Sequence, residues 1–164
     1  MAVLPLRVTP DPILRKRAKR VRAIDAYIKR LAEDMIDSMH AYNGVGIAAP
    51  QVGVSLRVIV IEIPEEPIIT LVNPEIVRKT GERDVNEGCL SIPGYRGEIK
   101  RAETVVAKGQ GLDGKEVRIK ATDLLAQALE HEVGHIQGSL YTDLLESMDK
   151  LYKLPPEEEE AHRG

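Results

Sequence analysis

The sequence is poor in aromatic residues. Its 164 residues include five Tyr but no Phe and no Trp. The core must therefore be built from Leu, Ile, Val, Ala and the four Met residues. There is also only one cysteine, Cys89, which excludes an intrachain disulfide framework. The lone thiol has to serve in packing, catalysis or metal binding.

Long hydrophobic runs are absent as well. No apolar stretch approaches the roughly 18 to 20 residues that a membrane-spanning helix needs. Residues 1–11 lack the charged and apolar regions of a secretory signal, and nothing near them has the Arg- and Ser-rich composition of a transit peptide. We therefore expect a soluble protein that is not exported and binds no membrane.

Neither charge sign is in strong excess. The formal net charge is −3, which argues against nucleic acid as the main ligand. One local exception is the basic run from Arg15 to Arg22 (RKRAKRVR). We interpret this run as a solvated segment and expect no direct binding of nucleic acid.

The length predicts a single domain, because compact domains peak at roughly 100 to 150 residues. We find no internal repeat and no linker that would divide the chain. Pro155 and Pro156 are followed by the acidic run Glu157 to Glu160. We therefore expect one domain over residues 1–150 and an acidic, disordered tail over 151–164.

Hydrophobic periodicity predicts two helices. Apolar residues recur at helical spacing from Ile24 to Met39, with Asp25 near the start, and the helix should stop at Asn43 and Gly44. A second periodic segment covers 122–137, with Thr122 as its N-cap and Gly138 as its stop.

The middle of the chain predicts short strands. Segments 57–63 and 68–72 are rich in β-branched residues and are separated by prolines. Segments 103–107 and 116–119 flank Asp113-Gly114, which is a hairpin signal. Strands in the middle with helices on either side predict an α+β fold, in which an N-terminal helix and a second, metal-binding helix accompany short-stranded antiparallel or mixed sheets.

The second helix carries the motif HEVGH, from His131 to His135. Imidazoles at positions i and i+4 lie on one helix face and can bind a single metal ion, and Glu132 beside the first can reach water at that ion. A catalytic site of this kind uses three protein ligands and keeps one open position. Two ordinary surface histidines are the alternative.

The third ligand has few candidates. A downstream Glu would have to come from Glu157 to Glu160, and a downstream His at the usual spacing is replaced by Tyr141. Upstream lies Cys89, within EGCLS. A lone cysteine is often a small buried hydrophobic residue, but a metal site in the same chain would need a further ligand, which its thiolate could supply.

A third segment, Gly44 to Gln51 (GVGIAAPQ), follows the first helix. Its two glycines would allow a substrate backbone to approach closely, and Pro50 fixes the chain direction before Gln51. By itself, the segment is more typical of a connection between a helix and a strand.

Taken together and in this order, GVGIAAPQ, EGCLS and HEVGH resemble the peptide deformylase family, whose members remove the formyl group from the N-terminal methionine of new proteins and release formate. The resemblance covers about residues 5 to 145 and makes 1–150 a single catalytic domain. Further segments that resemble the family are Asp11 to Arg15, Asn73-Pro74, Arg101 to Glu103 and Gly138 to Asp143.

The resemblance implies roles for particular residues. Cys89, His131 and His135 would hold one divalent ion, usually Fe(II) in this family, with Zn(II), Ni(II) or Co(II) also able to occupy the site. Glu132 would take a proton from the attacking water and deliver it to the leaving amine. The side-chain amide of Gln51 and the backbone N–H of Leu90 would stabilise the oxyanion.

The resemblance also implies substrate contacts. The backbone of Val45 and Gly46 should run alongside the peptide, and the side chains of Ala128 and Leu124 should line an apolar pocket for methionine. Glu87 and Arg101 complete the predicted substrate-binding set. Formylmethionyl nascent peptides are the expected partners, together with a transient ribosome contact. The resemblance also implies the bacterial cytoplasm as the compartment, with an organelle as the alternative.

Two departures from the family stand out. Gly134 occupies the position of an acidic residue in the usual HExDH motif, which should weaken the helix. The C-terminal residues are short and acidic, whereas some members carry a basic helix that docks on the ribosome. Two other functions stay open: a zinc peptidase of the HExxH type, and a non-catalytic module that binds formylmethionine.

Overall fold

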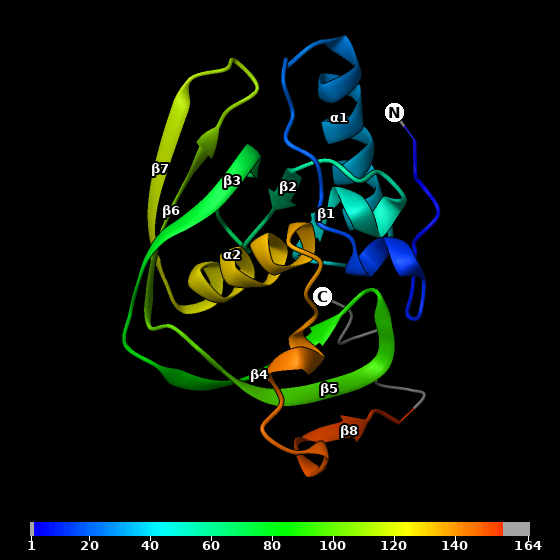
Figure 1. Ribbon diagram of the computed structural model, residues 1–164, viewed down its shortest axis with the longest axis vertical. Coiled ribbons are helices and arrows are strands. Elements are labelled where there is room, and N and C mark those ends of the chain that lie inside the picture. The colour runs from blue at the N-terminus through cyan, green and yellow to red at the C-terminus, as the bar shows by residue number, and fades with distance from the viewer. Residues whose placement is uncertain (1, 156–164) are drawn as a thin grey trace.

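The computed structural model describes residues 2–155 (Figure 1). Within them lie two α-helices, α1 (Ala26–Ala41) and α2 (Asp123–Ile136). The strands are β1 (Gly46–Ala48), β2 (Val58–Ile61), β3 (Ile69–Thr80), β4 (Arg83–Cys89), β5 (Ile92–Arg101), β6 (Thr104–Gln110), β7 (Glu116–Thr122) and β8 (Leu151–Lys153). Short 3-10 helices cover Pro12–Arg15, Ala49–Val52, Tyr141–Leu144 and Met148–Lys150. The predicted α+β class is confirmed.

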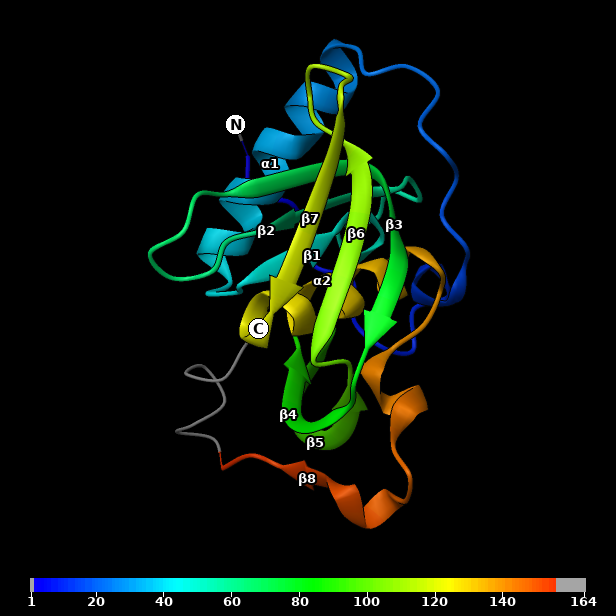
Figure 2. The ribbon, with the colours of Figure 1, turned by 90° about the vertical axis from the view of Figure 1, so that its left-hand side faces the viewer.

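The strands form two antiparallel sheets with α2 between them. The larger sheet has five strands in the order β1-β2-β3-β6-β7, and the smaller has three in the order β4-β5-β8. Helix α2 packs against the face of the larger sheet, while β4 and β5 curve around its other side (Figures 1 and 2). This arrangement brings the end of β4 close to the middle of α2.

The core is aliphatic, as the composition predicts. One buried cluster joins α2 to the larger sheet and includes Ile59, Val105 and Leu129. A second lies beneath α1 and includes Leu31, Met35 and Met39. Tyr141 is the exception, because its ring is buried in a third cluster beside Cys89.

Helix α1 follows its predicted pattern. The side chain of Asp25 accepts a hydrogen bond from the Ile28 backbone N–H at 3.1 Å, which satisfies one of the free amides of the first turn. The helix ends at Ala41, and Asn43 then adopts a positive φ of 57°. Its bounds therefore differ by only two residues from the predicted 24–39.

The two predicted strand pairs are present as β2–β3 and β6–β7. Strand β3 continues past the expected end at Val72 to Thr80, with one register shift at Asn73 and Pro74 and another between Ile76 and Arg78. Strands β1, β4, β5 and β8 were not predicted from the sequence. Pro93, Gly94 and Gly97 interrupt β5, so that segment lacks the apolar alternation of an ordinary strand.

The expected boundary of the tail at residue 151 is wrong. Leu151–Lys153 pair with β5 as strand β8, and Leu154 is buried. Backbone hydrogen bonds to a neighbouring strand stabilise this segment although the sequence beside it is acidic. The remainder of the expected disordered tail, residues 156–164, lies outside the described residues.

Helix α2 ends where the sequence predicts. Thr122 occupies the N-cap position, although its side chain makes no capping hydrogen bond. Gly138 follows the last turn with φ of 83°, a conformation that favours glycine. A Cβ atom there would lie 2.6 Å from the carbonyl oxygen of Arg15, so the chain segment that crosses the helix end also requires a glycine.

Gly134 lies in a different environment from Gly138. A Cβ atom at Gly134 would have as its nearest neighbour the Ser139 Cβ, at 4.0 Å. The helix therefore has room for a side chain there. We expect Gly134→Ala to raise the free energy of unfolding by about 1 kcal/mol, because glycine is a poor helix former. In a thermal melt at fixed metal content this corresponds to a rise in Tm of roughly 2–4 °C for a chain of this size.

Gly138→Ala serves as the matched control, and its melting temperature should fall. Equal or lower stability of Gly134→Ala than of the unchanged protein would show that the open space at position 134 has another use.

Candidate metal centre and active site

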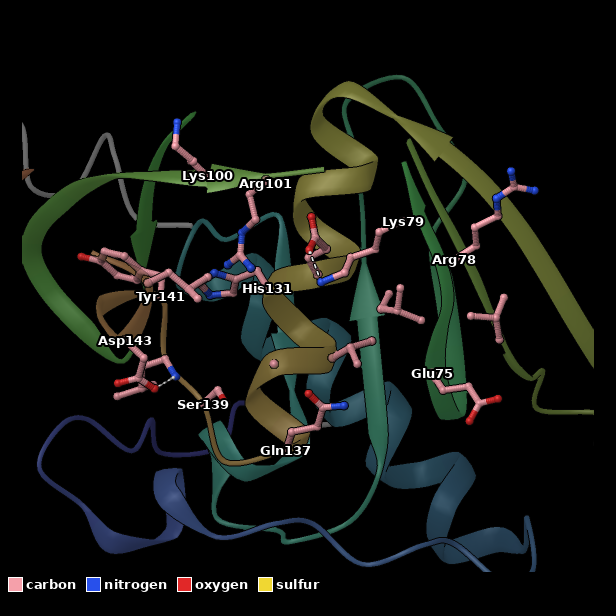
Figure 3. A pocket seen from close by; sticks show the side chains of 17 residues that line it. Glu75, Arg78, Lys79, Lys100, Arg101, His131, Gln137, Ser139, Tyr141 and Asp143 are labelled. Atoms are coloured by element: carbon pink, nitrogen blue, oxygen red, sulfur yellow. Dashed lines mark hydrogen bonds and ion pairs between the residues drawn. The ribbon is translucent and has the colours of Figure 1, made fainter. Parts of the chain in front are cut away.

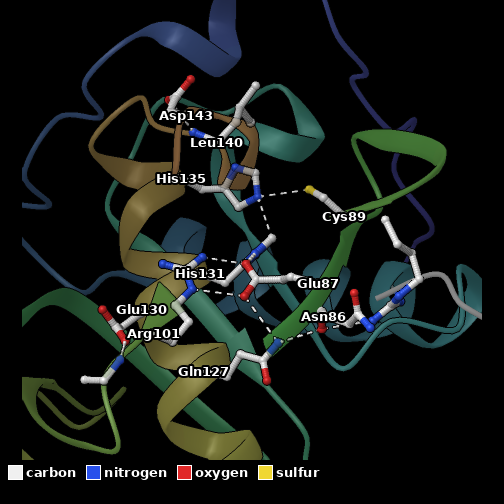
Figure 4. Close-up of polar contacts among 12 residues, drawn as sticks. Asn86, Glu87, Cys89, Arg101, Gln127, Glu130, His131, His135, Leu140 and Asp143 are labelled. Carbon is white, nitrogen blue, oxygen red and sulfur yellow. Dashed lines mark hydrogen bonds and ion pairs between the residues drawn. The ribbon is translucent and has the colours of Figure 1, made fainter. Parts of the chain in front are cut away.

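Two imidazoles converge on the buried face of α2. His131 and His135 are one helical turn apart, and their Nε2 atoms lie 3.1 Å from each other. Cys89, at the end of β4, brings its Sγ within 3.2 Å of the His135 Nε2 (Figure 4). All three side chains are buried, and their ligand atoms lie within 4.8 Å of one another.

This donor set fits a transition-metal ion. One thiolate and two imidazoles are ligands of intermediate softness, suited to Fe(II), Co(II), Ni(II) or Zn(II). Three protein ligands leave one position open, as catalytic metal sites require. Among residues 2–155, Cys89 is the third ligand candidate, and Tyr141 offers no imidazole. Glu157 to Glu160, the other candidates, lie outside the described residues.

A carboxylate from β4 fixes the orientation of the first histidine. Glu87 is hydrogen bonded to the Nδ1 of His131, which leaves Nε2 directed toward the ligand cluster. Arg101 donates to the same carboxylate through Nε at 3.0 Å and through Nη2, and Gln127 donates to it at 3.2 Å. The carboxylate of Glu87 thus has four donors, all from within the protein.

The electrostatics of Glu87 follow from these partners. Burial alone would raise its pKa, but the charge of His131 and the hydrogen bonds from His131 and Arg101 outweigh burial and lower the pKa to about 2. The carboxylate is therefore ionised at neutral pH. An ionised partner on Nδ1 makes the imidazole of His131 a stronger ligand.

Glu132 lies next to the ligand cluster and is 3% exposed. Its Oε1 atom is buried and has no hydrogen-bond partner in the described structure, which is unusual for a buried carboxylate. Burial raises its pKa to about 7, with the charge of Glu87 adding to the effect and the charge of His131 opposing it. A carboxylate in this state is suited to accept and donate protons near neutral pH.

Gly46 in β1 makes room for Glu132. A Cβ atom at Gly46 would lie 2.5 Å from Oε2 of Glu132 and about 3 Å from two further carbons of its side chain. Any larger residue would displace the carboxylate. The preceding glycine of the motif, Gly44, faces Leu90 instead, since its Cβ would lie 2.9 Å from the Leu90 Cδ1.

Gln51 approaches the cluster from the 3-10 helix that follows β1. Its Oε1 accepts from the Ala48 backbone N–H at 2.9 Å, so the amide group has a fixed orientation. Its Nε2 then donates to the Ser91 Oγ at 3.1 Å and lies 3.8 Å from the Cys89 Sγ. Leu90 is buried in the turn between Cys89 and Ser91, so both predicted oxyanion donors lie beside the cysteine.

The other residues predicted to contact the substrate differ in how far they are buried. Ala128 is buried one turn before His131 and Glu132 on α2, whereas Leu124 is 40% exposed at the start of the helix. Val45 is half-buried just before the edge strand β1. Arg101, predicted to contact the substrate, is buried and donates to Glu87.

A cavity of about 640 Å³ lies along the side of α2 that carries Glu130 and Gly134 (Figure 3). Its lining includes Gly134, which explains the open space there, and it reaches His131 and Arg101 from outside. Lys79 and Glu130 also line it and form an ion pair with 3.6 Å between Nζ and Oε1. The sequence analysis did not anticipate this cavity.

Several contacts in the site could not be found by sequence reasoning. Gln127, Glu130 and Ser91 each hydrogen bond to a residue at least 28 positions away. Gln127 and Glu130 belong to no recognisable metal or catalytic pattern, and their only sequence signal is that each lies within four residues of a predicted metal ligand. Ser91 belongs to the EGCLS motif, but that motif does not contain its partner Gln51.

Among residues 2–155, no helix is long and apolar enough to span a bilayer. This agrees with the lack of long apolar runs in the sequence.

Comparisons with known proteins agree with the site. The family model described as polypeptide deformylase matches residues 3–151. A peptide deformylase of Dehalococcoides mccartyi (strain CBDB1) is 54% identical over 97% of this chain and 96% of its own. One from Thermomicrobium roseum is 45% identical over 98% and 96%, respectively.

Solved structures agree as well. The crystal structure of a peptide deformylase from Legionella pneumophila has a TM-score of 0.87 and 43% identity, and the match covers 91% of this chain and 89% of that one. A peptide deformylase from Synechococcus elongatus in complex with actinonin has a TM-score of 0.87 and 38% identity, covering 90% and 81%. The family-model match, the sequence identities and the shared fold show that this chain belongs to the polypeptide deformylase family.

Proposed function

We propose that this protein is a metal-dependent hydrolase that removes the formyl group from the N-terminal methionine of newly synthesised proteins. The observation that carries the proposal is the buried cluster of Cys89, His131 and His135 with Glu132 beside it. Formylmethionyl nascent peptides are the proposed partners, with a transient ribosome contact at their source. The bacterial cytoplasm is the proposed compartment, because the relatives named above are bacterial.

Cys89, His131 and His135 would hold one divalent ion. When bound, such an ion supplies Lewis acidity at the reacting oxygen. We propose Fe(II) as the ion in the cell, on the resemblance to the family, with Zn(II), Ni(II) and Co(II) able to bind the same ligands.

The protein's own residues transfer the protons and stabilise the charge that develops during the reaction. Glu132 takes a proton from the attacking water, whose oxygen adds to the formyl carbon. The Gln51 side-chain amide and the Leu90 backbone N–H donate hydrogen bonds to the developing oxyanion. Glu132 then gives the proton to the amine nitrogen as the C–N bond breaks, which releases formate and a free methionine terminus.

Substrate binding would use the edge strand. We propose that the peptide lies beside Val45 and Gly46, because β1 is the outermost strand of its sheet and offers backbone groups on its open side. Ala128, with Leu124 at its outer end, would line the pocket for the methionine side chain. Glu87 and Arg101 orient His131 in this proposal, and residues 2–155 act as one catalytic unit.

The first test is formate release from formyl-Met-Ala, measured without oxygen on metal-stripped protein before and after loading with Fe(II). Release should require both the ion and the formyl group, and acetyl-Met-Ala serves as the control substrate. Cleavage of an internal peptide bond with no formate would favour a zinc peptidase. A folded, fully metal-loaded protein that binds the formyl peptide but releases no formate would favour a non-catalytic module.

Glu132 can be tested separately from the metal ligands. We expect Glu132→Ala to lower kcat by about 10²- to 10⁴-fold, because the proton carrier is lost, while metal content stays unchanged. Elemental analysis and formate release measure the two quantities. Glu66→Ala, which removes an exposed carboxylate, is the control. Near-normal turnover of Glu132→Ala would exclude Glu132 as the base.

Gly46 gives a test of geometry. We expect Gly46→Ala to lower kcat by about 100-fold, because the added methyl displaces Glu132 by roughly 1 Å. Metal content should not change, since Glu132 is not among the ligands. Gly134→Ala adds the same methyl where space is open and should keep its activity. Full activity of Gly46→Ala would mean that Glu132 is not held against β1 during turnover.

A further inference from the structure

We propose that Glu130 is a positioning residue for the metal site, acting on His131 through the backbone at Arg101 and Ala102. The inference rests on the proposed function only for its catalytic consequence. Its structural basis is a chain of contacts. Glu130 is hydrogen bonded to the Ala102 backbone. Arg101 is hydrogen bonded to Glu87, and Glu87 to His131 (Figure 4).

The first link is a hydrogen bond between distant segments. Oε2 of Glu130 accepts from the backbone N–H of Ala102 at 2.8 Å, across 28 residues of sequence. Both residues are shielded from solvent, with the Glu130 side chain 9% exposed and Ala102 buried. Without Glu130 this N–H would be left without a partner, which is costly for a shielded donor.

The second link is covalent. The amide nitrogen of Ala102 is bonded to the carbonyl carbon of Arg101, and the peptide group between them is planar. Fixing the direction of the Ala102 N–H therefore fixes the ψ angle of Arg101 and the point from which its side chain leaves the backbone. That side chain donates two hydrogen bonds to Glu87, whose carboxylate is bonded to the Nδ1 of His131.

The hydrogen bond matters more than the charge of Glu130. Its only ion-pair partner among the described residues is Lys79, at 3.6 Å, and the Lys79 side chain is 60% exposed. Ion pairs of this kind contribute about 0–1 kcal/mol. A glutamine at position 130 keeps an acceptor oxygen in the same place, whereas an aspartate keeps the charge but is one methylene shorter.

These differences define the experiment. Metal affinity is measured by competition with a chromogenic chelator for Co(II), together with the visible spectrum of the Co(II) protein. We expect Glu130→Ala and Glu130→Asp to weaken Co(II) binding by about 10-fold and to alter the spectrum. In other metalloproteins, mutation of residues that orient a metal ligand from outside weakens metal binding by about this factor. Glu130→Gln and the control Lys79→Ala should bind Co(II) within about twofold of the unchanged protein.

Turnover at saturating metal adds a second measurement. In Glu130→Asp, kcat should fall while KM stays unchanged, because Glu130 does not contact the substrate in this proposal. If Glu130→Ala fails to fold, Glu130→Asp carries the test.

Two outcomes would overturn the inference. A lower melting temperature with unchanged Co(II) affinity and spectrum would make Glu130 merely structural. If Glu130→Gln binds Co(II) as weakly as Glu130→Ala does, the loss of affinity comes from the charge of Glu130 and not from its hydrogen bond. Since Co(II) binding is measured without substrate, these outcomes are independent of whether the protein releases formate.

Discussion

The buried carboxylate of Glu87 is the interaction on which the rest of the site depends. A charge removed from water must be paired and hydrogen bonded, and here the donors come from the end of β5 and from α2. Glu87 itself lies in β4, two residues before Cys89. The same carboxylate that orients one metal ligand thus links the smaller sheet, which carries the cysteine, to the helix, which carries the two histidines.

The two sides of α2 are packed very differently. On the side facing β1, Glu132 is so close that Gly46 has no space for a methyl group. On the side facing the cavity, a Cβ atom at Gly134 would have the Ser139 Cβ, at 4.0 Å, as its nearest neighbour outside its own helix backbone. Close packing restricts the position of the Glu132 carboxylate, while the open side leaves room for a side chain at position 134.

Local signals in the sequence predicted α1, α2 and the two hairpin pairs because each depends on neighbouring residues. Asp25 and Gly138 mark helix ends through contacts within one or two turns. Strands β4 and β5 gave no such signal, since polar residues, glycines and Pro93 obscure the alternation. They are held by each other, by β8 and by the groups gathered around Glu87, none of which a local pattern contains.

By itself, the sequence determined which residue types are available and which of them share a helix face. The i, i+4 spacing of His131 and His135 places both imidazoles on one side of α2, because the helix turns about once every 3.6 residues. Only the tertiary structure decided that Cys89 lies 3.2 Å from His135, that Arg101 is buried on Glu87 and not at the surface, and that Glu130 holds Ala102. The physical reason is that these pairs are 14 to 46 residues apart, so their distances follow from sheet register and from how α2 packs between the sheets, not from the local geometry of the chain.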